Sequence, residues 1–136
     1  ISPKLAAVVC LGTTLGFFMT TPVIIALRAA SHICFALLGA VLIRKIPEII
    51  EKPLPSTVFN GGLAFVHALA EVAVVSPFFL AGSIFKPEQL ADGYVMSVLV
   101  LVGVGTFLHS LIDYTVSIML WKPVRAALPS LAELRE

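Results

Sequence analysis

The sequence predicts an all-α integral membrane protein, and two observations support this prediction. Of the 136 residues, 59% are hydrophobic and only 12% are charged, with a mean hydropathy of +1.04. The apolar residues gather in four long stretches separated by short polar segments. Each stretch comes close to the roughly 20 residues that a helix needs to cross the hydrocarbon core of a bilayer. We therefore expect a bundle of about four transmembrane helices in one domain, residues 1–136.

The first two stretches, 5–21 and 23–43, are separated by one tight turn. Pro22 ends the first stretch, because proline interrupts a helix but readily begins the next one. The second stretch ends at Arg44, where a polar segment with three prolines extends to Thr57 and indicates a loop at the membrane interface. These signals predict a helical hairpin followed by an interfacial connection.

The third and fourth stretches cover 58–82 and 94–121. The segment 83–93 between them carries charge and proline, which is typical of a connection outside the membrane. Tyr94 and Trp121 border the fourth stretch, and such aromatic residues are enriched at membrane interfaces. A polar tail is expected from Pro123 onward. Because the chain begins at Ile1 without a methionine, we also expect an N-terminal part to be missing.

Basic residues predict the orientation. They are concentrated after the second and fourth stretches, at Arg44, Lys45, Lys52, Lys122, Arg125 and Arg135. The opposite loops offer only Lys86. The positive-inside rule then places both termini in the cytoplasm of a multi-pass cell-membrane protein. With a net charge of only +1 and no basic patch with interleaved aromatic residues, the chain is not expected to bind nucleic acid.

Six ionisable side chains lie within the apolar stretches, where such groups are costly and usually functional. They form three pairs at i, i+4 spacing, which places both members of a pair on the same helix face: Arg28 with His32, His67 with Glu71, and His109 with Asp113. The pairs lie at similar depth, and Asn60 extends the polar stripe of the third stretch. We therefore expect three helices to wall one polar site near the membrane midplane, with Arg28 at its outer mouth.

Arginine beside histidines favours a small anionic ligand. A guanidinium can bind a carboxylate through two parallel hydrogen bonds, and an imidazole can donate to or accept from a ring heteroatom. A carboxylated heteroaromatic compound fits this pattern. No nucleotide-binding motif occurs in the chain, so we do not expect it to hydrolyse ATP, and no cofactor is implied.

Other roles remain open at this stage. Imidazoles and carboxylates also suit transition metals, so the same residues would serve a metal carrier or a membrane-embedded metal-dependent hydrolase, with ligands from His67, Glu71, His109 and Asp113. A proton relay through these pairs is another alternative. In a non-catalytic assembly subunit, the pairs would only hold helices together through hydrogen bonds.

Four segments resemble the substrate-binding S components of energy-coupling factor vitamin transporters, and most of all a niacin-type member: Phe17–Pro22, Leu27–His32, Phe65–Glu71 and Phe107–Tyr114. The resemblance implies a vitamin-binding subunit without catalytic activity, which works with a coupling transmembrane subunit and two cytosolic ATPases. Family members usually have six membrane helices, so the resemblance also implies a six-helix fold of which four helices are visible here.

Taken together with this resemblance, the residues receive distinct expected roles. Arg28 is expected to bind the carboxylate of a niacin-like vitamin. The three histidines, His32, His67 and His109, are expected to contact its ring or to orient one another. Glu71 and Asp113 are expected to fix the tautomers of these histidines. Asn60 is a weaker candidate on the inner side of the site.

Overall fold

The computed structural model describes residues 2–83 and 86–127. Its long helices are α1 (Pro3–Thr20), α2 (Val23–Lys45), α3 (Pro53–Leu80) and a fourth that begins as the π-helix η2 (Val95–Val104) and continues as α5 (Gly105–Ala127). All four are long and apolar enough to cross a membrane. The described residues contain no β-strand, and the predicted all-α membrane fold is confirmed.

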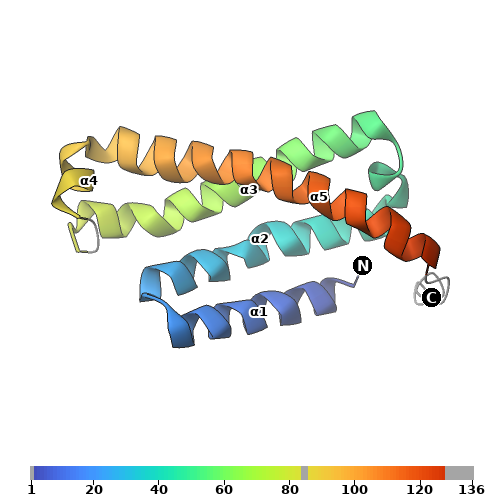
Figure 1. Ribbon diagram of the computed structural model, residues 1–136, viewed down its shortest axis with the longest axis horizontal. Helices are drawn as coiled ribbons and strands as arrows, with labels where there is room; N and C mark the ends of the chain where they lie inside the picture. Colours follow the sequence, from blue (N-terminus) through green and yellow to red (C-terminus); the bar gives the residue numbers. More distant parts are fainter. Residues whose placement is uncertain (1, 84–85, 128–136) are drawn as a thin grey trace.

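The long helices lie side by side, with α3 at the centre (Figure 1). α1 and α2 form an antiparallel hairpin, and α2 packs against α3. The fourth helix crosses α3 in this view and contacts it through both η2 and α5. α2 and α5 thus both pack on α3 but hardly contact one another. Side chains of α2 and α5 can therefore be brought together through a side chain of α3.

Proline residues begin the elements that follow the turns. α3 starts at Pro53, five residues before the expected apolar stretch, because proline in a first helical turn loses no intrahelical hydrogen bond. Two short helices also begin at proline within the expected connections, η1 (Pro47–Ile50) and α4 (Pro87–Ala91). α5 continues through Pro123 to Ala127, so the first part of the expected polar tail is helical. Residues 128–136 of that tail lie outside the described residues.

The helices approach one another through small side chains. Alanine is the commonest buried apolar residue, and close contact through small residues is the usual way in which membrane helices pack. A Cβ at Gly103 would lie 3.1 Å from Val72 Cγ2, so this glycine allows η2 to approach α3 closely. Beside these apolar residues the structure buries several polar side chains: Ser31, Asn60, His67, Glu71, Ser97 and Thr106. Three of them meet near the middle of α3.

Candidate functional site

The carboxylate of Glu71 is the centre of a polar cluster that joins three helices. Glu71 lies on α3 and is 4% exposed. Its Oε2 accepts hydrogen bonds from Nε and Nη2 of Arg28 on α2, at 2.8 and 2.6 Å. The same oxygen accepts a hydrogen bond from Oγ1 of Thr106 on α5, at 2.9 Å. One buried carboxylate oxygen therefore receives donors from both helices that flank α3.

Two histidines face the other oxygen of this carboxylate. Nε2 of His32 lies 3.4 Å from Glu71 Oε1, and Nε2 of His67 lies 3.3 Å from it. The two imidazole rings pack edge to face with centroids 4.5 Å apart, and Phe35 stacks on His67 at 4.3 Å. On its other side, His67 Nδ1 lies 2.5 Å from Ser110 Oγ on α5. We call these residues the Glu71 cluster: Arg28, His32, His67, Glu71, Thr106 and Ser110.

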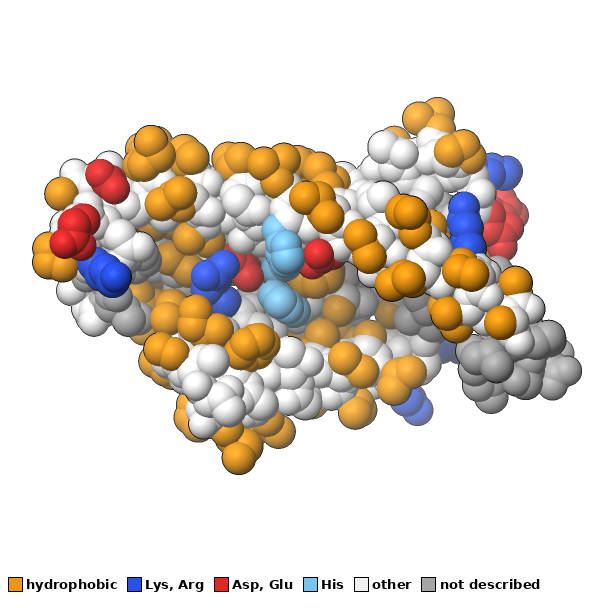
Figure 2. All heavy atoms as spheres, in the orientation of Figure 1, with side chains coloured by type: hydrophobic (Ala, Val, Ile, Leu, Met, Phe, Trp, Pro, Cys, Tyr) orange, Lys and Arg blue, Asp and Glu red, His pale blue; other side chains and the backbone are white. Residues whose placement is uncertain are grey.

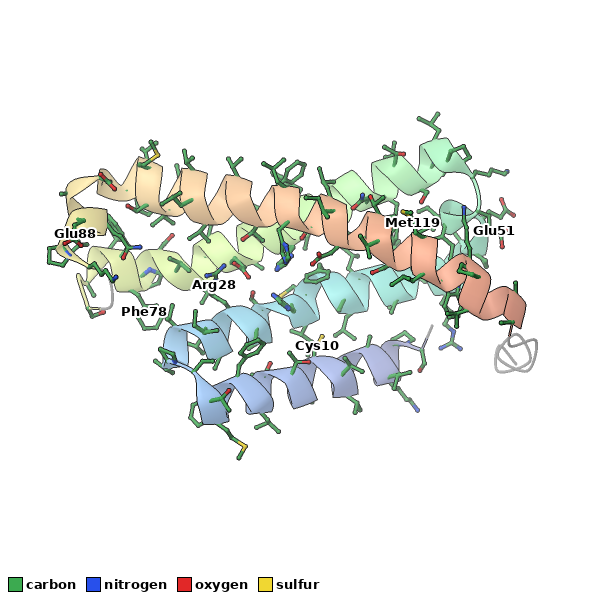
Figure 3. The ribbon with its side chains drawn as sticks, viewed as in Figure 1. Cys10, Arg28, Glu51, Phe78, Glu88 and Met119 are labelled. Atoms are coloured by element: carbon green, nitrogen blue, oxygen red, sulfur yellow. The ribbon has the colours of Figure 1, made fainter. Side chains whose placement is uncertain are left out.

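Arg28 has a different partner from the one that helical spacing indicated. The sequence paired it with His32, one turn along the same helix, but its guanidinium binds Glu71, 43 residues away. Figure 3 places Arg28 in the space between α2 and α3. Its side chain is 34% exposed, and Glu71 occupies only two of the five N–H donors of a guanidinium. Among the described residues nothing accepts from its other three donors, which are left for another acceptor.

His109 and Asp113 are not brought into the cluster, although the sequence placed them on the wall of the same site. Their side chains pair with each other, His109 Nε2 to Asp113 Oδ2 at 2.9 Å, and are 68% and 60% exposed. α5 contacts the cluster through Thr106 and Ser110 instead. Because successive residues of an α-helix are turned by roughly 100°, a helix that points Ser110 at α3 turns His109 away from it.

Asn60 also lies apart from the cluster. It precedes His67 by seven residues, about 10 Å along the helix axis. Its side chain is buried, and its Nδ2 donates to the carbonyl oxygen of Leu111 on α5 at 3.3 Å. This bond ties α3 to α5 and uses one of the two N–H donors of the amide.

Three residues of the polar stripes were not among the site residues expected from the sequence, yet they lie at the cluster: Thr106, Ser110 and Phe35. Thr106 and Ser110 stand at i, i+4 spacing, the same signal that drew attention to His109 and Asp113. The spacing identified the part of α5 that lies beside α3. It could not decide whether Thr106 and Ser110 or His109 and Asp113 face that helix. Phe35 shares the helix face of Arg28 and His32 and offers aromatic surface for stacking, but phenylalanine is also ordinary in helices that face lipid, so this signal was weak.

The arrangement is suited to recognising an anion. Basic, acidic and histidine side chains gather near the middle of one face of the molecule, between α2 and α5 (Figure 2). A guanidinium with unused donors lies beside two imidazoles and an aromatic ring, and the buried carboxylate holds the guanidinium in place. The remaining N–H donors of this guanidinium are suited to hydrogen-bonding the oxygens of an anionic group such as a carboxylate.

Comparison with known proteins gives one clear relative. The chain is 34% identical over 129 residues to the niacin transporter NiaX of Lactococcus lactis subsp. cremoris (strain MG1363). The similarity covers 94% of this chain and 56% of the relative, so the chain spans about half the length of the curated protein it matches. No family model and no solved structure matches the chain. The resemblance to niacin-type transporters noted in the sequence is thus confirmed.

Proposed function

From the premise that this membrane protein is a homologue of a niacin transporter, we propose that it is the substrate-binding subunit of a vitamin importer. Its substrate is a small carboxylated heteroaromatic compound such as niacin. This proposal rests on the guanidinium of Arg28, which Glu71 holds within apolar helices while no described residue accepts from its other three N–H donors.

The proposed binding mode follows from which groups are accessible. Arg28 and His32 are each 34% exposed, whereas His67 and Glu71 are almost fully buried. The substrate carboxylate binds the free donors of Arg28, because charged and doubly hydrogen-bonded pairs are the strongest polar contacts available to it. His32 then contacts the heteroaromatic ring, whose nitrogen is a hydrogen-bond acceptor. Phe35, 5.5 Å from the His32 ring centroid, supplies aromatic surface beside it.

Glu71, His67, Thr106 and Ser110 act as positioning residues in this proposal. Thr106 and Arg28 both bind Glu71 Oε2, so the carboxylate cannot rotate without losing three hydrogen bonds. Ser110 holds the His67 ring on which Phe35 stacks. A guanidinium fixed in this way loses little conformational entropy when the substrate arrives, which favours tight binding.

We leave Asn60, His109 and Asp113 outside the proposed substrate site. The amide of Asn60 binds the backbone of α5, two turns away from His67. His109 and Asp113 satisfy each other on the exposed side of α5.

The further parts of the proposal come from the resemblance to energy-coupling factor transporters. The chain acts without catalysis of its own and associates with a coupling transmembrane subunit and two cytosolic ATPase subunits. Both termini face the cytoplasm, an orientation supported by the basic residues Arg44, Lys45 and Lys52 after α2, because Lys86 is the only basic residue of the connection between α3 and η2.

Isothermal titration of the detergent-solubilised protein with nicotinate tests the proposal. We expect Arg28→Ala to weaken nicotinate binding by about 10- to 100-fold, since a hydrogen-bonded contact to a charged group contributes about 1.5–3 kcal/mol. Arg44→Ala is the matched control, because Arg44 lies exposed in the last turn of the same helix. Nicotinamide lacks the negative charge, so it should bind the unmodified protein more weakly than nicotinate does. Its affinity should change little in Arg28→Ala.

Two results would contradict the proposal. If the unmodified protein does not bind nicotinate, the substrate class is wrong. If Arg28→Ala and Arg44→Ala bind nicotinate equally well, Arg28 is not the carboxylate-binding residue. Size-exclusion chromatography of each variant distinguishes a lost contact from a protein that no longer folds.

A further inference from the structure

Three potential metal-ligand atoms converge in the Glu71 cluster. Nε2 of His32 and Nε2 of His67 lie 3.4 and 3.3 Å from Oε1 of Glu71, and all three atoms lie within 4.8 Å of one another. Zinc binds histidine nitrogen and carboxylate oxygen at roughly 2.0–2.1 Å, which in tetrahedral geometry separates neighbouring ligand atoms by about 3.3–3.4 Å. The two separations from Oε1 match this value, and the two Nε2 atoms lie within 4.8 Å of one another, so one ion can bind all three atoms if the two rings adjust toward it.

His67 supplies the second and independent observation. Its side chain is only 6% exposed, and within the described part of the chain its Nε2 has no hydrogen-bond partner. Its Nδ1 lies 2.5 Å from Ser110 Oγ. In the tautomer that carries its proton on Nδ1, His67 donates to this hydroxyl and the lone pair of Nε2 is directed toward Glu71. An unsatisfied buried nitrogen is costly, and a bound cation would satisfy it.

The surroundings of these three atoms resemble the outer contacts of a metal site. Ligating histidines usually donate their second nitrogen to a neighbouring group, and ligating carboxylates are themselves hydrogen-bonded. Here Ser110 holds His67, while Arg28 and Thr106 hold Oε2 of Glu71, so that Oε1 faces the two histidines. Two histidines and one glutamate form a ligand set with which zinc keeps a fourth position open.

We propose that His32, His67 and Glu71 bind a divalent transition-metal ion of the zinc class, whose open coordination position accepts an anionic ligand. The charge balance requires such an anion. Glu71 neutralises Arg28 and the imidazoles are neutral, so an ion of charge +2 leaves an excess of two positive charges. The statement that this anion is the transported carboxylate depends on the proposed function, whereas metal binding itself does not.

This site differs from the metal site that the sequence allowed. There the imidazoles and carboxylates of all three helices were candidates, with His67, Glu71, His109 and Asp113 foremost. The structure separates His109 and Asp113 from the cluster and keeps His32 of α2 beside His67 and Glu71. His109 therefore becomes the control that distinguishes the two sets.

The test is a titration of the purified full chain with Co²⁺, after removal of the purification tag and treatment with a chelator. Four-coordinate Co²⁺ with nitrogen and oxygen ligands absorbs strongly in the visible range, and elemental analysis of the zinc-loaded protein gives the stoichiometry. We expect one ion per chain and at least tenfold weaker Co²⁺ binding in His32→Gln and His67→Gln. His109→Gln should bind Co²⁺ like the unmodified protein.

The outcomes separate this inference from the proposed function. Absence of Co²⁺ absorption, or equal absorption in His67→Gln and the unmodified protein, overturns the metal site even where nicotinate binds. Loss of Co²⁺ binding in His109→Gln with retention in His32→Gln also overturns it. If Co²⁺ binds but nicotinate binds neither the loaded nor the chelated protein, the proposed function fails and the metal site remains. Equal nicotinate affinity with and without the ion overturns only the statement that the substrate carboxylate is the anion bound at the metal.

Discussion

The ion pair between Arg28 and Glu71 connects α2 to α3, and its energy can be measured with a double-mutant cycle. Arg28→Met removes the guanidinium but keeps an apolar stem, and Glu71→Gln removes the charge but keeps the shape. The pair makes two hydrogen bonds, at 2.8 and 2.6 Å. The cycle measures how much of the stability depends on both partners being present.

The expected coupling energy follows from the burial of the two partners. A hydrogen bond to a charged group contributes about 1.5–3 kcal/mol, whereas polar pairs between membrane helices average about 0.6 kcal/mol. Glu71 is buried, but the Arg28 side chain is 34% exposed, so water screens part of the interaction. We therefore expect a coupling of about 1–2 kcal/mol. We also expect Arg28→Met to cost more than Glu71→Gln, because it leaves a charged carboxylate buried.

Equilibrium unfolding in mixed detergent micelles, followed by circular dichroism, measures these energies. The control cycle uses Glu48 and Lys52, an i, i+4 pair 3.7 Å apart whose side chains are 71% and 67% exposed. Exposed pairs of this kind contribute little, so no measurable coupling is expected there. A coupling of Arg28 with Glu71 as small as that of the control, or a larger cost for Glu71→Gln than for Arg28→Met, would refute the reasoning.

Three further substitutions test the packing around the site, each by the same unfolding measurement. Thr106→Val removes a hydroxyl donor from the buried carboxylate and should destabilise the protein by about 1 kcal/mol, whereas Thr115→Val, which loses only a bond within its own helix, should have a smaller effect. Gly103→Ala should destabilise the protein because its Cβ would meet a rigid valine at 3.1 Å, while Gly105→Ala has open space and should be neutral or slightly stabilising. Asn60→Ala should cost about 1 kcal/mol without changing nicotinate affinity, and a large loss of affinity would return Asn60 to the site.

The sequence alone determined the class of the protein and the approximate limits of its membrane helices. Apolar stretches of the length of a bilayer leave few alternatives to transmembrane helices, because the backbone must satisfy its own hydrogen bonds in lipid. It also marked Arg28, His32, His67 and Glu71, since ionisable groups inside such stretches stand out against the apolar background. Proline correctly indicated where turns lie, but it did not exclude helix at Pro53 and Pro123.

Which of these residues meet was decided only by the tertiary structure. Spacing along one helix pairs Arg28 with His32 and treats His109 like Ser110, because it contains no information about the neighbouring helix. The packing of both α2 and α5 against α3 places Glu71 beside Arg28 and makes it the partner of that guanidinium. The π-helix η2, with its i→i+5 hydrogen bonds, changes the register before α5 and thereby affects which polar stripe faces α3. Neighbouring residues of a helix differ in direction by about 100°, which is enough to bury one side chain in the cluster and expose the next. Only contact with another helix determines which of them is buried.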